Sequence, residues 1–220
     1  MKLRNFFNPL HTRTKRNYID RMQNNKADCM ATARKFDKHF FDGERRFGYG
    51  GYKYIEGLLT PMAHEILKVY EIKDNSKVLD AGCGKGFLLY EMKKIKPSIQ
   101  VAGYDCSSYA IENCKSELRG NLFVHKAENI SKFKDNEFDF AMTLGTFHNL
   151  NLRPLISAIK EFVRVSKKQY LMVESYRNEK ELFNLQCWAL TCNAFYSPDD
   201  WKYIFDIAGY EGDYEFIYFE

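Results

Sequence analysis

The sequence lacks the features that mark membrane-spanning, secreted and metal-binding chains. No stretch of the 220 residues approaches the roughly 18 consecutive apolar residues that a membrane-spanning helix needs. The N-terminal residues contain no apolar core of a secretory signal, so we expect a cytoplasmic protein. The six cysteines form no C-x-x-C pair, and in the cytoplasm they would be reduced thiols. We therefore expect neither a metal site nor a membrane span.

The sequence also lacks a strong net charge, although its charge is unevenly distributed. A formal charge of +4 is too mild to indicate a nucleic-acid-binding surface, so we expect no nucleic-acid partner. The first 26 residues hold seven basic side chains and a single acid, Asp20. This segment is either a solvated arm or an arm that helps to capture an anionic ligand. The chain length allows one well-buried core, and we expect a monomer or a homodimer.

The segment 78–86 reads Val-Leu-Asp-Ala-Gly-Cys-Gly-Lys-Gly and is the most informative stretch of the chain. Two β-preferring residues lead into Asp80, three glycines alternate, and an apolar helical run follows. Such a strand, loop and helix bring backbone N–H groups close to a ligand, where any Cβ would clash. The G-x-G-x-G spacing differs from the G-x-G-x-x-G of dinucleotide-binding folds, whose third glycine is placed for a pyrophosphate.

A second acidic residue follows the next predicted strand. Asp105 comes about 20 residues after the glycines, where nucleotide-binding α/β folds hold a ribose through its hydroxyl groups. Predicted strands alternate with helices at 77–80, 99–104, 121–125, 138–143 and 169–174. This alternation predicts a doubly wound, mostly parallel α/β sheet that binds its ligands at the carboxyl ends of the strands.

Two further motifs follow, each a predicted strand with the turn after it, at 122–130 and 138–149. Together with the glycine loop and Asp105 they resemble, in order and spacing, the motifs of the class I S-adenosylmethionine-dependent methyltransferases. The resemblance implies a Rossmann-like sheet, S-adenosylmethionine as the methyl donor and S-adenosylhomocysteine as the product. It implies that Asp105 holds the ribose and that Asp80 orients the loop or meets the donor's amino group. The other donor-binding residues that it implies are Gly82, Gly84, Ala127, Glu128 and Leu144. A nicotinamide-dependent dehydrogenase is the main alternative.

One expected element is missing from the end of the sequence. The class I fold normally closes with two strands, the last inserted antiparallel beside the fifth, whereas only the segment 213–219 has strand character here. Either the sheet is one strand short or another segment of the chain supplies the missing piece.

The acceptor site is expected outside the shared donor motifs. We predict a basic helical extension with a glycine- and tyrosine-rich lid at 1–58, and a methyltransferase core at 59–220. An acceptor-site insertion at about 177–196 interrupts that core. In the lid, the hydroxyl groups of Tyr49 and Tyr52 would reach the methionine end of the donor. The alternative is a structural turn whose rings fill gaps in the core.

Several side chains outside the donor motifs are candidates for the acceptor and for catalysis. We expect Arg45, Arg46 and Arg177 to bind an anionic acceptor and Trp188 to form a wall of its pocket. Each arginine could equally be a solvated charge, and Trp188 could pack an extra helix. His148 and Glu174, at the ends of the fourth and fifth strands, are the catalytic candidates. His148 would act as a base for a neutral acceptor, whereas an anionic acceptor needs none.

Motifs that specify several other classes of acceptor are absent. The loop after the fourth strand reads Gly-Thr-Phe-His-Asn, without the Asn/Asp-Pro-Pro-Tyr of enzymes that methylate DNA adenine or protein glutamine. The chain has no Pro-Cys dipeptide for a cysteine nucleophile, no acidic metal-binding pair of the catechol type, and no paired glutamates of arginine-methylating enzymes. A small-molecule acceptor remains.

A closer resemblance extends over most of the chain. The segments 10–18, 42–52, 173–178 and 185–190 resemble a group of bacterial methyltransferases found with surface-polysaccharide genes, including those for O-methyl phosphoramidate decoration of capsules. This resemblance implies methyl transfer to a small anionic precursor of surface polysaccharide, including a phosphoramidate oxygen. The alternatives are O- or N-methylation of a neutral sugar or other metabolite, and a non-catalytic donor-binding sensor or inactive partner subunit.

Overall fold

The computed structural model describes residues 1–50 and 52–220, so Gly51 of the expected lid lies outside the described residues. The helices are α1 (Asn8–His11), α2 (Tyr18–Gln23), α3 (Lys26–Ala33), α4 (Lys38–Asp42), α5 (Thr60–Val69), α6 (Phe87–Ile95), α7 (Ser108–Glu112), α8 (Leu152–Val165), α9 (Glu179–Trp188) and α10 (Pro198–Ala208). The strands are β1 (Lys77–Ala81), β2 (Gln100–Asp105), β3 (Leu122–Val124), β4 (Phe140–Leu144), β5 (Gln169–Glu174) and β6 (Asp213–Ile217).

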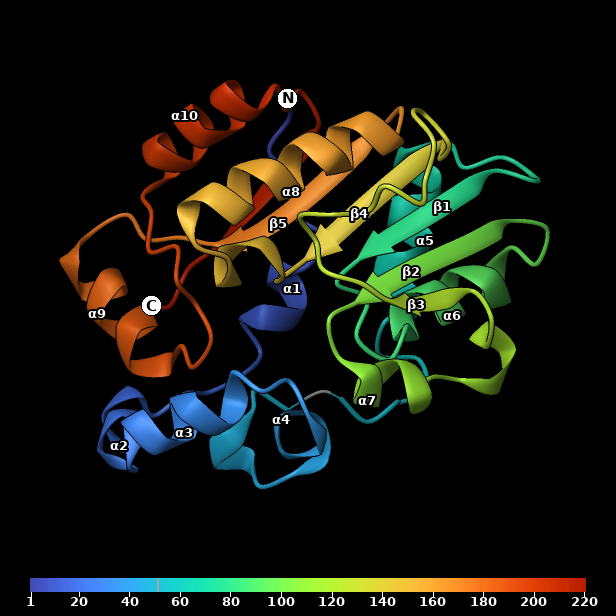
Figure 1. Ribbon diagram of the computed structural model, residues 1–220. Helices are drawn as coiled ribbons and strands as arrows, with labels where there is room; N and C mark the ends of the chain where they lie inside the picture. The colour runs from blue at the N-terminus through green and yellow to red at the C-terminus, as the bar shows by residue number, and fades with distance from the viewer. Residues whose placement is uncertain (51) are drawn as a thin grey trace.

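The strands form a single sheet between two layers of helices (Figure 1). Their order is β3-β2-β1-β4-β5-β6, and each neighbouring pair is parallel, which confirms the predicted doubly wound sheet. Successive side chains of a strand point to opposite faces. Val78 accordingly packs with α5 and α6 on one face, and Leu79 packs with α8 and α10 on the other. Both residues are fully buried, as expected for a sheet covered on both sides.

The final strand replaces the expected antiparallel pair. β6 lies directly beside β5 in parallel, with Tyr170 opposite Asp213. Its outer edge is covered by the N-terminal residues, because the Arg4 N–H donates to the Tyr214 carbonyl (2.8 Å) and the Tyr214 N–H donates to the Lys2 carbonyl (3.0 Å). The described sheet has six strands, so the first alternative holds and the sheet is one strand short. The N-terminal segment adds an isolated bridge between Leu3 and Tyr214 at the outer edge of β6, which is not a further strand.

Helix boundaries follow local signals at α10 but not at α5. Ser197 and Asp200 form a reciprocal capping box before α10, and Gly209 ends that helix at φ +70°, as these residue types favour. The hydroxyl of Thr60 could cap α5, but Thr60 is instead the first residue of the helix, and Leu59 is the N-cap. The Thr60 hydroxyl donates to the Glu91 carboxylate of α6, so a tertiary contact uses the group that would have capped the helix.

A buried carboxylate on β6 fixes the start of the chain. Glu215 is 0 % exposed. Its oxygens accept hydrogen bonds from the backbone N–H groups of Phe6 (2.7 Å), Phe7 (3.0 Å) and Asn8 (2.7 Å), and from the Tyr170 hydroxyl (2.6 Å). Three of these donors lie at the beginning of α1, where N–H groups have no partner within the helix. The contact places α1 and the residues after it beside the carboxyl ends of the strands (Figure 1).

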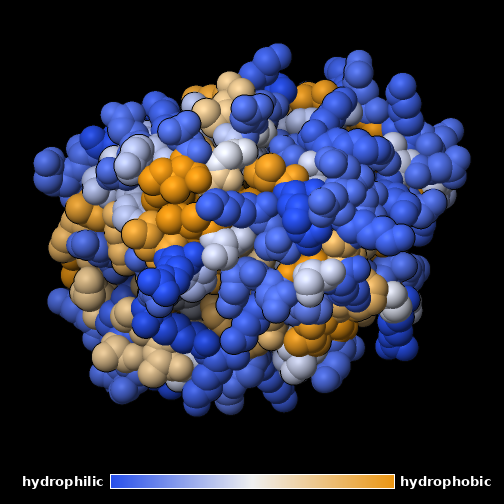
Figure 2. All heavy atoms as spheres, turned by 45° about the horizontal axis from the view of Figure 1, so that its top comes forward, coloured by the Kyte–Doolittle hydropathy of each residue, from blue (hydrophilic) through white to orange (hydrophobic). Residues whose placement is uncertain are grey.

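The face of the molecule shown in Figure 2 is mostly hydrophilic, with small separate apolar patches. Leu152 of α8 and Ile207 of α10 are among the exposed apolar residues. Within the described residues, no helix is both long and apolar enough to cross a membrane.

We predict that Glu215→Ala destabilises the protein. The change leaves four buried N–H and O–H donors without an acceptor, each at a cost of about 1–3 kcal/mol, so we expect a total loss of about 4 kcal/mol or more. Urea unfolding measures this loss. Glu211→Ala, at an exposed position just before the same strand, is the control and should change little. A loss below about 1 kcal/mol for Glu215→Ala would show that water replaces the carboxylate.

Candidate active site

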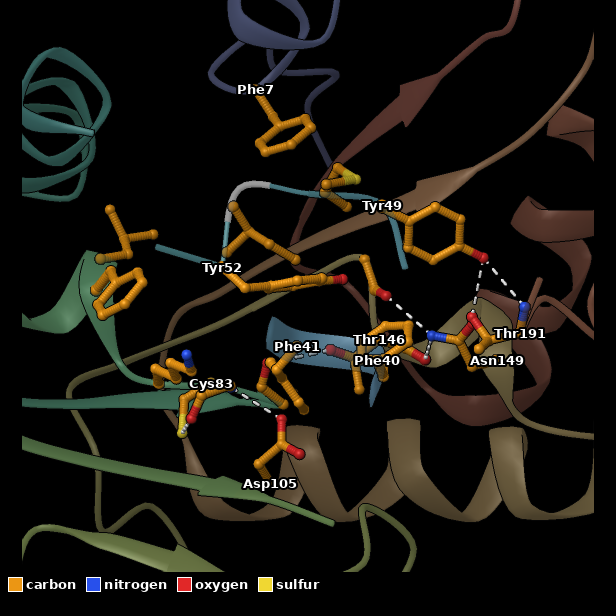
Figure 3. Close-up of a pocket in the computed structure, with 18 of the residues that line it drawn as sticks. Phe7, Phe40, Phe41, Tyr49, Tyr52, Cys83, Asp105, Thr146, Asn149 and Thr191 are labelled. Carbon is orange, nitrogen blue, oxygen red and sulfur yellow. Dashed lines mark hydrogen bonds between the residues drawn. The ribbon is translucent and has the colours of Figure 1, made fainter. Parts of the chain in front are cut away.

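A cavity of about 720 Å³ lies at the carboxyl ends of the strands, beneath the N-terminal helices (Figure 3). Its walls bring together most of the residues that the sequence indicates. Those that line it are Arg45, Tyr49, Tyr52, Asp80, Gly82, Gly84, Asp105, Ala127, Glu128, Leu144, His148, Glu174 and Trp188. Residues from the first 41 positions complete the walls, including Phe7, His11, Arg16 and Phe41.

The glycines are required by the backbone geometry of the loop after β1. Gly82 has φ +80°, and a Cβ there would lie 2.0 Å from Oγ1 of Thr146 on the loop after β4. Gly84 has φ +53°, and its N–H donates to the Asp105 carboxylate at 2.8 Å. The loop therefore lies tightly against the ends of both neighbouring strands, with its backbone at the cavity.

Asp105 is held in a fixed orientation at the end of β2. One carboxylate oxygen accepts from the Gly84 N–H, and the other accepts from the Ser107 N–H at 2.9 Å (Figure 3). Burial raises the pKa of Asp105, while these backbone bonds oppose the shift. A carboxylate oxygen has two acceptor sites, so each oxygen keeps one for a ligand hydroxyl. This geometry suits a ribose with free 2′- and 3′-hydroxyl groups.

Asp80 is suited to a cationic ligand group. Its side chain is 5 % exposed and lines the cavity. Burial, together with the nearby Asp105, raises the pKa of Asp80 to about 8. A positively charged group beside it, such as the ammonium or sulfonium of S-adenosylmethionine, would stabilise its ionised form.

The lid lies over the cavity, but its two tyrosines have different surroundings. The Tyr49 hydroxyl accepts hydrogen bonds from the N–H groups of Leu190 (2.6 Å) and Thr191 (3.0 Å), so it is bonded to the segment expected as the acceptor-site insertion (Figure 3). These bonds correct the prediction that the Tyr49 hydroxyl reaches the donor, because backbone groups occupy it. The Tyr52 ring packs on Phe40 and Phe41, with centroids 5.1 and 4.9 Å away, and its hydroxyl has no partner among the described residues.

An ion pair joins the lid to the glycine loop. The Lys85 ammonium lies 2.6 Å from the carboxylate of Asp42, the last residue of α4. The Tyr109 hydroxyl of α7 donates to the same carboxylate at 2.7 Å. The Lys85 side chain is almost completely buried, so solvent screens this pair weakly. The lid is thus fixed to the loop whose backbone faces the donor end of the cavity.

His148 and Glu174 form a buried pair at the ends of β4 and β5. The Glu174 N–H donates to Nδ1 of His148 at 3.2 Å, so the proton of the neutral imidazole is on Nε2, which lies 3.5 Å from the Glu174 carboxylate. Burial lowers the pKa of His148 to about 3. Neither ring nitrogen then offers a free lone pair, which argues against His148 as the base.

Glu174 is the member of the pair that can accept a proton near neutral pH. Burial raises the pKa of Glu174 to about 7, with Cys192 and then Arg16 opposing the shift. Its Oε2 is buried and has no hydrogen-bond partner among the described residues. A carboxylate whose pKa lies close to the working pH is suited to general-base catalysis.

Two of the four residues expected at the acceptor do not line the cavity. The Nε of Arg46 lies 3.0 Å from a carboxylate oxygen of Glu44. The guanidinium group of Arg177 pairs with Glu181, four residues later in the chain, and with Glu220. The prediction that they contact the acceptor is therefore corrected, because neighbouring carboxylates bind both guanidinium groups. Arg16, which sequence reasoning did not select, takes a place in the wall. Two signals point to it: its place in the basic N-terminal segment, for which capture of an anionic ligand is one of two interpretations, and its position in the segment 10–18, where the closer family resemblance begins.

Comparison with known proteins agrees with this geometry. A family model described as "Methyltransferase domain" matches residues 72–209, more than half of the chain. The ribosomal RNA small subunit methyltransferase C of Pectobacterium atrosepticum is 29% identical over 108 residues, 48% of this chain and 31% of that protein. The chain thus spans about a third of the length of this curated relative.

Solved structures share the fold at low sequence identity. One is a chain of the complex between the Haloferax volcanii Trm112 methyltransferase activator and a methyltransferase, with a TM-score of 0.56, 19% identity, and 67% of this chain and 66% of that chain covered. Another is the YcgJ protein of Bacillus subtilis, with a TM-score of 0.54, 20% identity, and 66% of each chain covered. These likenesses confirm the class I Rossmann-like fold.

We predict that Asp105→Ala weakens S-adenosylmethionine binding more than about tenfold, a loss of about 1.4 kcal/mol or more. The variant removes the acceptor for the ribose hydroxyls and for the Gly84 N–H. Calorimetric titration measures the affinity, and Asp206→Ala, on the exposed side of α10, is the control. Unchanged affinity of Asp105→Ala would refute the assignment.

We also predict a pH-dependent effect of Glu174→Gln on stability. The pKa of Glu174 rises on folding from 4.5 to about 7, so between these values the folded protein keeps a proton that the unfolded chain releases. The wild-type free energy of unfolding then falls as pH rises through this window, and glutamine removes this contribution. From about pH 5 to about pH 8, the variant should gain on the order of 2 kcal/mol relative to wild type.

Urea unfolding at the two pH values measures this gain. Because Asp80 titrates in both proteins, its contribution cancels in the difference. The exposed Glu179→Gln, which also removes one carboxylate, is the control and should show no such gain. Identical pH dependence in wild type and Glu174→Gln would mean that the Glu174 carboxylate is not desolvated.

Proposed function

This chain belongs to the methyltransferase domain family, a class I family whose methyl donor is S-adenosylmethionine, and we propose that it methylates a small anionic molecule bound beneath the lid. The membership removes the nicotinamide-dependent dehydrogenase as an alternative. The observation that carries the proposal is the continuity of the cavity. Asp80 and Asp105, at the carboxyl ends of β1 and β2, line the same cavity as Arg45, Trp188 and Glu174, so donor and acceptor can meet inside it.

The donor would lie along the carboxyl ends of β1 and β2. In this arrangement Asp105 accepts from the ribose hydroxyls, and the backbone at Gly82 and Gly84 lies against the donor. Asp80 meets the amino group, and Ala127 and Glu128 face the adenine. Leu144, at the end of β4, packs beside the donor. Each of these residues lines the cavity, which supports the assignment.

Methyl transfer from a sulfonium requires the protein to align the reacting atoms more than to activate the methyl donor. The acceptor atom attacks the methyl carbon, the new bond to carbon forms as the carbon–sulfur bond breaks, and S-adenosylhomocysteine leaves. Because the sulfonium is already a good leaving group, the protein contributes mainly by holding the three atoms in line and excluding water. A neutral hydroxyl acceptor would also lose a proton, and Glu174 is placed to take it. An anionic oxygen needs no base.

We propose a precursor of bacterial surface polysaccharide as the acceptor, with a phosphoramidate oxygen as a specific candidate. The support is the resemblance of segments 10–18, 42–52, 173–178 and 185–190 to methyltransferases found with surface-polysaccharide genes. Residues of all four segments line the cavity, Arg16, Tyr49, Glu174 and Trp188 among them. The neutral metabolite and the non-catalytic donor-binding sensor remain the alternatives.

A ribosomal RNA nucleotide is a second candidate acceptor, favoured by the similarity to ribosomal RNA small subunit methyltransferase C. That similarity covers about half of this chain. The lid and the N-terminal segment both contribute walls to the acceptor end of the cavity. An RNA nucleotide would therefore have to enter beneath them, which favours a small free molecule.

We predict that wild-type protein transfers label from methyl-labelled S-adenosylmethionine to small molecules in an extract of the source cell. Purified small ribosomal subunits, tested in parallel, should stay unlabelled. Asp105→Ala is the control that identifies enzyme-dependent label. Label in ribosomal RNA alone would contradict the small-molecule acceptor, and donor binding without transfer to either pool would support the sensor.

A further inference from the structure

Three guanidinium groups surround the ring of Trp188 at the acceptor end of the molecule. The guanidinium carbons of Arg16, Arg21 and Arg45 lie 5.4, 5.0 and 5.3 Å from the centre of the indole. Each is within the range of a cation–π contact. Three positive charges around one ring repel each other, so the cluster needs an explanation beyond its contacts with the ring.

Arg21 has a structural role that accounts for its position. Its Nη1 donates to the carbonyls of Arg45 and Arg46, both at 3.1 Å, and its Nη2 donates to the Gly48 carbonyl at 2.8 Å. These bonds hold the lid backbone against Trp188. Arg21 does not line the cavity, so its charge is not presented to a ligand.

Arg16 carries a positive charge that its hydrogen-bond partners do not neutralise. Its Nη1 donates to the carbonyls of His11 (3.2 Å) and Thr14 (3.1 Å), and its Nη2 bonds Nδ1 of His11 at 3.0 Å. All of these partners are neutral, because burial and the charge of Arg16 lower the pKa of His11 to about 4. Its Nε is buried and has no hydrogen-bond partner among the described residues. Burial lowers the pKa of Arg16, and the nearby Arg45 also acts in that direction.

Arg45 lies exposed at the wall of the same cavity, with its Nη1 donating to the Gly48 carbonyl at 2.6 Å. Within the described part of the chain, neither Arg16 nor Arg45 has a carboxylate within 4 Å. Arg4, Arg46 and Arg177 are each paired with one. The three arginines that pair with a carboxylate therefore lie outside the cavity wall. Arg16 and Arg45, which have no such partner among the described residues, line the cavity.

We propose that Arg16 and Arg45 bind an oxyanion group of the acceptor beside the ring of Trp188, with the unpartnered Nε–H of Arg16 as one donor. The inference rests on the proposed function in one respect, that the cavity takes a small acceptor. It adds the chemical class of the acceptor's anchoring group, an oxyanion such as a phosphoryl or sulfate. It also assigns a substrate-binding role to Arg16, which the N-terminal segment supplies. Guanidinium groups recognise such oxyanions through several parallel N–H donors.

The oxyanion would be held away from the acidic donor end. Asp80 and Asp105 lie after β1 and β2, whereas Glu174, at the end of β5, is the carboxylate that acts on Arg16. An oxyanion between Arg16 and Arg45 would offset the repulsion within the cluster. It would also leave the remainder of the acceptor free to extend toward the methyl group.

Inorganic phosphate, with sulfate in parallel, is the probe for this site. The chain has two tryptophans, and Trp201 is completely buried in the core, so a ligand-dependent emission change reports on Trp188. With S-adenosylhomocysteine saturating and ionic strength held constant with chloride, phosphate or sulfate should change the emission saturably. Trp188→Phe should abolish the signal. Calorimetric titration of the same anions gives an independent affinity.

Arg16→Gln and Arg45→Gln should each weaken binding of the tighter anion at least tenfold. Arg16→Lys keeps the charge but loses the planar set of N–H donors, so it should recover only part of the wild-type affinity for the anion. Arg46→Gln and Arg177→Gln are matched controls outside the cavity and should stay within twofold of wild type. Unchanged S-adenosylhomocysteine affinity in every variant shows that the fold is intact.

Two results would overturn the proposal. One is wild-type protein that binds neither anion, and the other is anion affinity that Arg16→Gln leaves unchanged while donor affinity is retained. Failure of wild type to bind S-adenosylhomocysteine would instead contradict the proposed function. In that case anion titration without the donor would still test the Arg16 site.

Discussion

The carboxylate of Glu215 fixes the N-terminal segment to the sheet, and the ligand cavity depends on that contact. Because β6 lies parallel beside β5, Glu215 faces the same layer as the Tyr170 hydroxyl and accepts from it. The same carboxylate accepts three backbone N–H groups at the start of α1. From there the chain places Phe7, His11 and Arg16 in the cavity wall. A single buried charge thus joins the last strand of the fold to the acceptor end of the site.

Side chains of both charges line the cavity. In the proposed arrangement the donor lies beside the carboxylates of Asp80 and Asp105, which suit a ligand that carries a sulfonium and an ammonium group. The acceptor then lies beside Arg16 and Arg45, with Glu174 as a carboxylate that burial keeps partly protonated near neutral pH. A cationic donor and an anionic acceptor would each be attracted to a different end of the same space. Such a division orients both molecules before any reaction takes place.

The features of the fold and the site that could be predicted from the sequence alone are those determined by local interactions. The glycines at 82 and 84 lie in a left-handed backbone that few other residues adopt, so their pattern predicts the loop. Ser197 and Asp200 specify the start of α10 within four residues. The parallel, doubly wound arrangement of the strands follows from the alternation of strands and helices. The donor-end residues could therefore be placed together at the ends of β1 and β2 without a structure.

Elsewhere the outcome depends on partners that are distant in sequence. The Thr60 hydroxyl bonds Glu91, and the Tyr49 hydroxyl bonds backbone groups about 140 residues away. Arg46 and Arg177 are different, because their partners Glu44 and Glu181 are only two and four residues away, and these local carboxylates were not recognised as partners. Arg16 was missed for the opposite reason, since only the folding of α1 against β6 brings it to the cavity. Charge in the sequence is visible, whereas its neutralisation is a property of the tertiary structure.

The pairing of the N-terminal segment with β6 also bears on the order in which the chain acquires structure during synthesis. The bonds from Phe6, Phe7 and Asn8 to Glu215 join residues that are 207 to 209 positions apart. A nascent chain can form β1 to β5 and much of the apolar core while its first eight residues still have no partner. Contacts of such long sequence separation form late, because the entropy of closing the intervening loop must first be offset. Residues 2–8 are therefore synthesised long before the strand that binds them and are among the last to fold, and the wall of the cavity that Phe7, His11 and Arg16 form is completed only when β6 has joined the sheet.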